Sequence, residues 1–77
     1  MPSDRKKRDA LIIKAFEERY KDLVTYANGK VDNLAVAEEL VQDTFAAACK
    51  DTASFVNSDN QVAWIYGTLR NLIRHHL

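Results

Sequence analysis

Apolar residues recur at steps of three and four along most of this chain, the spacing that places them on one face of an α-helix. The first such segment runs from Asp4 to Asn28. The residues of its predicted apolar face are Ile12, Ile13, Phe16, Tyr20, Leu23, Val24 and Ala27. Ser3 can accept from the free N–H groups at its start, and Asn28 and Gly29 tolerate the left-handed geometry that often ends a helix.

A second segment with the same period runs from about Leu34 to Lys50, and Asp32 or Asn33 can cap it. Its apolar stripe comprises Leu34, Ala37, Leu40, Val41, Phe45 and Ala48. Off this stripe lie three polar residues at i, i+3 and i+4, a spacing that places them on one exposed face. They are Glu39, Gln42 and Asp43.

The third segment follows a polar stretch, residues 51–60, with Phe55 at its centre. Ser58 and Gln61 have the spacing of a capping box, so the third helix is predicted to begin near Asp59. Its apolar face comprises Val62, Ile65, Tyr66, Leu69, Leu72, Ile73 and His76. Its opposite face carries Thr68, Arg70, Asn71, Arg74 and His75, with no acidic residue.

Composition agrees with an all-α domain of three helices that occupies residues 1–77. Two Gly and one Pro among 77 residues are too few for a turn-rich β fold. A single Cys49 excludes an internal disulfide and fits a reducing compartment. No apolar run approaches the ~18 residues of a membrane span, and Lys14 and Glu17 interrupt the apolar stretch near the start, which excludes a signal peptide.

The net charge of zero conceals a division along the chain. Residues 1–31 carry a net +3, residues 32–51 a net −4, residues 52–60 a net −1 and residues 61–77 a net +2. Local charge, and not the total, steers partners toward a surface. The acidic middle and the basic end are therefore candidates for different partners, although charged residues also serve simply to solvate helices.

Residues with catalytic or metal-binding chemistry are poorly placed for either role. Cys49 has no His near it in sequence to activate a thiolate. His75 and His76 are adjacent, about 100° apart on a helix, and so cannot share a metal as an i, i+4 pair does. We expect no enzyme activity, no cofactor and no metal.

Two stretches of the chain resemble a known protein family. Ala37–Lys50, AEELVQDTFAAACK, and Ala63–Leu77, AWIYGTLRNLIRHHL, with Phe55 and a polar loop between them, are similar to region 2 of bacterial sigma factors of the extracytoplasmic-function (ECF) type in the sigma-70 family. The resemblance covers roughly residues 16–77. It implies a cytoplasmic protein for transcription initiation that performs no chemistry of its own.

The resemblance implies that the acidic helix binds the clamp coiled coil of the largest catalytic subunit of RNA polymerase. The matching positions are Glu39, Gln42, Asp43, Phe45 and Cys49. Carboxylates on this face suit a partner rich in Arg, because carboxylate–Arg pairs can be bidentate.

The resemblance also implies recognition and melting of the −10 promoter element, with a flipped base of the nontemplate strand held between the loop and the last helix. The matching positions are Phe55, Asn57, Ser58, Asp59, Asn60, Tyr66, Gly67, Arg70, Asn71, Arg74 and His75. Base extraction costs a few kcal/mol, which stacking at ~1–3 kcal/mol per base can offset. Among these positions, Arg70, Arg74 and His75 would meet backbone phosphates.

Some positions depart from the family pattern. Trp64 is followed by Ile65, whereas primary sigma factors have two adjacent Trp, and we expect Trp64 to pack in the core. Gly67 stands where many relatives have a larger residue, which leaves the base preference open. The C-terminal helix-turn-helix domain of such factors does not follow, so we expect a domain cut from a longer chain. An anti-sigma factor is a further expected partner, and a helical interaction module or sigma-like adaptor without DNA binding is the alternative.

Overall fold

The structure, a computed structural model, describes the backbone of residues 2–77 and the side chains of residues 9–77. Within the described backbone there are four α-helices and no strand: α1 (Pro2–Val31), α2 (Leu34–Lys50), α3 (Thr52–Val56) and α4 (Gln61–His76). The all-α fold class is confirmed. The predicted third helix corresponds to α4, and α3 is a short helix in what sequence reasoning treated as a polar loop.

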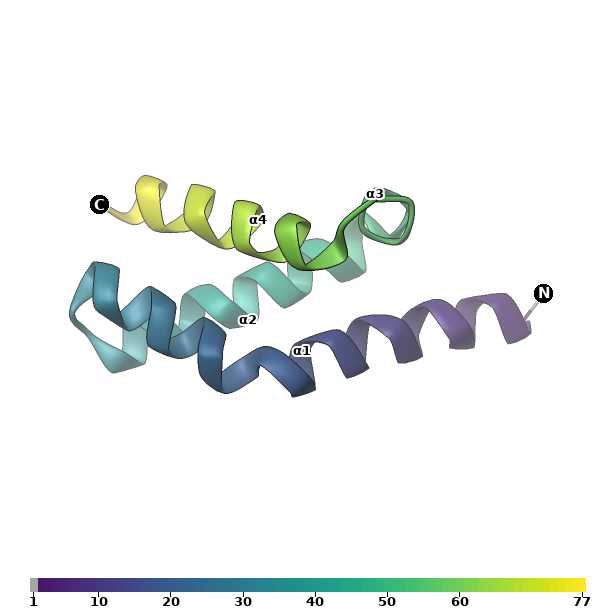
Figure 1. Cartoon of the computed structure of the whole chain (residues 1–77), viewed down its shortest axis with the longest axis horizontal. Helices are drawn as coiled ribbons and strands as arrows, with labels where there is room; N and C mark the ends of the chain where they lie inside the picture. Colours follow the sequence, from purple (N-terminus) through teal and green to yellow (C-terminus); the bar gives the residue numbers. More distant parts are fainter. Residues whose placement is uncertain (1) are drawn as a thin grey trace.

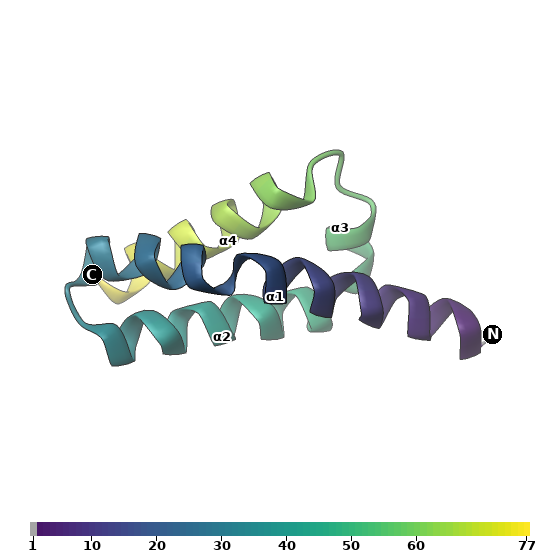
Figure 2. The same cartoon turned by 60° about the horizontal axis from the view of Figure 1, so that its bottom comes forward.

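The helices form a small bundle in which α1 and α2 make an antiparallel pair and α4 packs across both (Figure 1). Because α3 carries the chain back from the end of α2, α4 runs in the same direction as α1. The C-terminal end of α4 therefore lies beside the turn that joins α1 to α2, while α3 lies at the other end of α4 (Figure 2).

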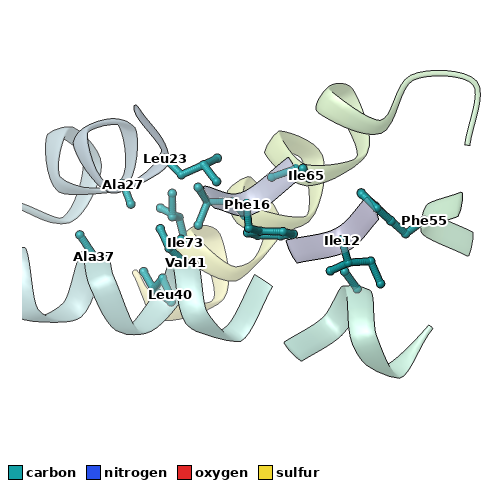
Figure 3. Close-up of a cluster of buried hydrophobic side chains, with 12 residues drawn as sticks. Ile12, Phe16, Leu23, Ala27, Ala37, Leu40, Val41, Phe55, Ile65 and Ile73 are labelled. Carbon is teal, nitrogen blue, oxygen red and sulfur yellow. The ribbon is translucent and has the colours of Figure 1, made fainter. Parts of the chain in front are cut away.

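The core is a single cluster of buried apolar side chains drawn from all four helices (Figure 3). Its members are Ile12, Phe16, Leu23, Ala27, Ala37, Leu40, Val41, Ala48, Phe55, Ile65, Leu69 and Ile73. The small residues Ala27, Ala37 and Ala48 are completely buried, which lets the helices approach closely. The one buried polar side chain of the described set, Thr44, donates from Oγ1 to the Leu40 carbonyl at 2.9 Å.

The predicted end of the first helix is wrong by three residues. α1 continues through Gly29, whose φ is not positive, and ends at Val31. The left-handed residue is Asp32, with φ 52°, and its N–H donates to the Asn28 carbonyl at 2.8 Å. Asp is among the few non-glycine residues that adopt this conformation readily. The capping role predicted for Ser3 lies outside the described side chains.

The N-caps of the later helices are Asn and Asp residues. Asn33 caps α2, its Oδ1 accepting from the Val36 N–H at 3.1 Å. Asp51 closes α2 and also caps α3. The predicted start of the last helix near Asp59, with Ser58 as cap, is wrong, because Asn60 is the cap of α4 and accepts from the Ala63 N–H at 3.0 Å.

Four residues assigned to apolar faces are exposed and not buried. They are Ile13, Tyr20, Leu34 and Val62. His76, assigned to the same face of the last helix, is exposed as well. The predicted faces were too wide, since Ile12 and Ile13 are about 100° apart around a helix and only Ile12 points into the bundle. No helix in the described backbone is long and apolar enough to cross a membrane.

Candidate functional site

The polar face of α2 is exposed as predicted. Burial of Ala37, Leu40, Val41, Thr44 and Ala48 against the other helices fixes the rotation of α2. Glu39, Gln42 and Asp43 consequently lie on its solvent side, and all three are exposed. The structure thus brings together an acidic patch within one helical turn.

An apolar groove runs beside this patch, between α1 and α2. It is a hollow of about 280 Å³ lined by Ile13, Phe16, Glu17, Tyr20, Val41, Gln42 and Phe45. Phe45, half-buried, meets the ring of Phe16 edge to face, with centroids 5.2 Å apart. Cys49 lies one turn beyond Phe45 and is exposed. Two of the five predicted docking residues, Gln42 and Phe45, therefore belong to a shared groove and not to α2 alone.

The contribution of α1 to this groove was not predicted. Ile13 is 45% exposed and Tyr20 is 40% exposed, although both were assigned to the buried face. A signal was available, because Ile12 and Ile13 are adjacent and cannot both point inward. Ile13 therefore points to solvent and, with Tyr20, leaves apolar area exposed along the groove.

Phe55, one of the residues predicted to contact a base, does not lie in an open pocket in this structure. It is completely buried in the core, and its ring meets that of Trp64 edge to face with centroids 5.2 Å apart. The indole Nε1 of Trp64 donates to the Ser54 hydroxyl at 3.1 Å. Phe55 thus anchors α3 to α4, and its ring is not accessible for stacking on a base in this structure.

In the connection between α3 and α4, two side chains form hydrogen bonds to the backbone and two point to solvent. Ser58 is half-buried, and its hydroxyl donates to the Asn60 carbonyl at 3.1 Å and accepts from the Asn60 N–H at 3.3 Å. Asn60 uses its side-chain oxygen to cap α4. Asn57 and Asp59 are exposed. Of the four predicted loop residues, these two have the side chains most available to a ligand.

One face of α4 is open to solvent. Arg70, Asn71 and Arg74 are exposed and lie within about 100° of one another around the helix. Gly67, one turn before Asn71, has nothing within 4 Å of the position a Cβ would occupy, so the space above it is empty. His75, the remaining predicted phosphate contact, is also exposed.

Tyr66 lies apart from Gly67 and Asn71. It is half-buried on the side of α4 that faces α1, where its ring meets that of Tyr26 edge to face at 5.4 Å. Residue 66 precedes residue 67 by about 100° around the helix. Tyr66 therefore joins α1 to α4, while Trp64, on the opposite border of the exposed face, joins α4 to α3.

Among the described side chains, no three His, Cys, Asp or Glu residues converge in a way that could hold a metal ion. His75 and His76 are both exposed, at the end of α4. The described side chains thus form two candidate binding surfaces. One is acidic and apolar and lies on α1 and α2, and the other is basic and polar and lies on α4.

Comparisons with known proteins identify a family and a relative to which this chain is similar. Residues 15–77 match the family described as Sigma-70 region 2. The chain is also 34% identical over 55 residues to a protein of Haemophilus influenzae named "Probable RNA polymerase sigma factor". That alignment covers 71% of this chain and 28% of the relative, so the chain spans little more than a quarter of the relative's length. No solved structure matches the chain significantly.

Proposed function

We propose a function from the premise that this chain belongs to the sigma-70 region 2 family. The chain is the promoter-recognition domain of an alternative sigma factor, and it binds RNA polymerase and promoter DNA together in the cytoplasm. The observation that carries the proposal is the family match over residues 15–77, which includes every surface residue discussed above except Ile13. The single Trp64, followed by Ile65, supports placing it with the ECF type.

The surface on α1 and α2 is the docking site for the clamp coiled coil of the largest catalytic subunit of polymerase. Its acidic patch of Glu39, Gln42 and Asp43 pairs with Arg side chains of the partner. The groove beside it takes an apolar side chain of the same partner helix, since helix-in-groove binding combines apolar anchors with charged edges. Docking on this face buries apolar area that the free chain leaves exposed at Ile13 and Tyr20.

The surface on α4 binds the nontemplate strand of the −10 element. Gly67 leaves the helix surface open, with nothing within 4 Å of the position a Cβ would occupy, and one turn later the exposed Asn71 can read a base edge with its amide. Asn57 and Asp59 approach the same base from the connection between α3 and α4. Arg70, Arg74 and His75 meet the phosphates on either side.

Charge reversal on α2 tests the docking site. The double substitution Glu39→Lys with Asp43→Lys is expected to abolish binding to a purified clamp fragment, because it places two cations against a basic partner. Glu18→Lys with Asp22→Lys is the matched control, since these exposed acids have the same i, i+4 spacing on the far side of α1 from the groove. Equal binding by both double variants would disprove the docking assignment.

Substitution of Asn71 tests the DNA site independently. Asn71→Ala is expected to weaken capture of a single-stranded nontemplate oligonucleotide, measured by fluorescence anisotropy, without changing the fold, because Asn71 is exposed. His76→Ala, also exposed but more than 100° away on α4, is the control. A chain that binds the clamp but captures no oligonucleotide, even as the unsubstituted protein, would instead be a sigma-like adaptor.

A further inference from the structure

Three cationic side chains from two helices converge on one hollow at the edge of the α4 surface described above. The hollow, of about 220 Å³, is lined by Tyr26, Lys30, Arg70, Ile73, Arg74 and Leu77. No acidic residue is among them. Two of the cations come from α4, while the third, Lys30, comes from the last turn of α1 and had no predicted role.

The fold itself creates this convergence. α1 and α4 run in the same direction, so their C-terminal ends lie side by side (Figures 1 and 2). The edge-to-face contact of Tyr26 with Tyr66 holds the two helices in register. One turn after Tyr26, the Nζ of Lys30 lies 5.7 Å from the centroid of the Tyr26 ring. This cation–π contact holds the ammonium group at the edge of the hollow.

Helix dipoles account for only part of the arrangement. A cation in the last turn of a helix is favourable, which explains Lys30 and Arg74 without any ligand. The effect falls off beyond the last turn, and Arg70 lies six residues before the end of α4. In the chain from residue 9 onward, the salt bridge formed joins Arg19 to Glu18, and none of these three cations pairs with an acid.

Like charges that lie close together without a counter-ion repel one another and raise the free energy of the free protein. A bound anion removes this repulsion and lowers the free energy. Arg70 and Arg74 present planar forks that suit phosphate oxygens, and Lys30 adds a compact charge. Tyr26, Ile73 and Leu77 form an apolar lining.

We propose that this hollow binds a backbone phosphate of DNA and that Lys30 on α1 is one of its ligands. The proposal rests on the proposed function, because it takes the DNA that crosses α4 as the source of the phosphate. It extends the DNA surface from α4 onto α1. A phosphate here lies on the α1 side of α4, beside the face that carries Asn71, and so it would fix the strand's path without reading its sequence.

The salt dependence of DNA binding tests the site. Lys30→Gln removes one phosphate contact, so the slope of log affinity against log salt for a mixed-sequence duplex is expected to fall in magnitude by about 0.9. Lys21→Gln is the matched control, since Lys21 is exposed on α1 nine residues earlier, about 180° around the helix. Lys21→Gln is expected to keep the slope of the unsubstituted chain, and Lys30→Arg is expected to restore it.

Three other outcomes overturn the proposal, and they differ from one another. Equal slopes for Lys30→Gln and Lys21→Gln would exclude Lys30 as a DNA ligand. If inorganic phosphate at constant ionic strength also shifted the Lys30 NMR signals in that case, the hollow would bind a small anion and not DNA. If the unsubstituted chain bound neither duplex nor nontemplate oligonucleotide, the proposed function itself would fail. Circular dichroism melting of each variant establishes that the fold is retained.

Discussion

At the scale of single residues, an aromatic side chain can fill a core or meet a partner, and its neighbours decide between the two uses. Phe55 and Trp64 contact each other, and the indole N–H of Trp64 has a partner in Ser54. A partly buried indole whose N–H has a hydrogen-bond partner is well held in place. Moving Phe55 out to stack on a base would break the contacts that attach α3 to α4.

Phe55→Ala is therefore expected to act mainly on stability. Removing a completely buried aromatic ring leaves a cavity and costs about 3–5 kcal/mol. A urea unfolding curve should show a lower midpoint, and Phe55→Leu, which keeps most of the volume, should lose clearly less. Unchanged stability together with lost oligonucleotide capture would instead return Phe55 to the base pocket.

The two uses of an aromatic residue could not be separated from the sequence alone. The resemblance placed Phe55 in the base pocket, and its position in a polar stretch was compatible with either use. Burial depends on the ring of Trp64, nine residues later, and on core residues such as Ile12, which lies near Phe55 although it is distant in the chain (Figure 3). The exposure of Arg70, Asn71 and Arg74, in contrast, was predictable because periodicity assigns the faces of a helix directly.

At the scale of elements, the groove between α1 and α2 shows that the proposed docking surface comes from two helices and not from α2 alone. α2 supplies acids and amides, but the apolar part of the surface includes residues of α1. An exposed Ile or Tyr beside a groove gains free energy only when a partner covers it. α1 therefore contributes both to the core and to the proposed docking surface.

Ile13→Asp is expected to weaken clamp binding by about tenfold or more. Covering the exposed half of an Ile is worth on the order of 1 kcal/mol, and burying a carboxylate in its place adds a further cost. Leu11→Asp is a close control, because Leu11 is 46% exposed against 45% for Ile13, lies on the same helix and does not line the groove. Comparable losses in both variants would show that the charge acts generally and not through the groove.

The start of α4 supports a prediction about capping. Asn60 provides the side-chain acceptor for the first turn, while Ser58 bonds only to the backbone of Asn60. Asn60→Ala is expected to cost about 1 kcal/mol, and Asn60→Ser much less, because Ser is nearly as good a cap. Thermal melting measures the difference. A larger loss for Ser58→Ala than for Asn60→Ala would restore Ser58 as the functional cap.

Element boundaries were the least predictable part of the fold. Three helices and their order followed from periodicity, but Ser58 and Asn60 are both good caps and only the backbone geometry distinguishes them. Asp32 took the left-handed position that Gly29 seemed suited to, since the core keeps α1 helical up to Val31. Local sequence offers several valid ends to a helix, and tertiary packing selects one.

At the scale of the whole molecule, a chain with no net charge separates its charges by surface. Exposed acids gather on α2, at Glu39 and Asp43, and exposed cations lie on α4, at Arg70 and Arg74, and near the end of α1, at Lys30. α1 lines both the groove and the basic hollow, at positions about 15 Å apart along its axis. The two proposed surfaces therefore include different parts of the same helix.

This separation predicts that clamp and DNA bind independently. Arg70→Gln with Arg74→Gln is expected to weaken oligonucleotide binding and leave clamp affinity unchanged, and Glu39→Lys with Asp43→Lys is expected to do the reverse. Effects at sites that share no partner add within ~0.3–0.5 kcal/mol, so the fourfold variant should show the sum of both losses. Clamp affinity measured with and without saturating oligonucleotide checks the same point, because coupling between sites is reciprocal. A change in clamp affinity of more than about threefold on adding oligonucleotide would mean that α1 transmits one binding event to the other surface.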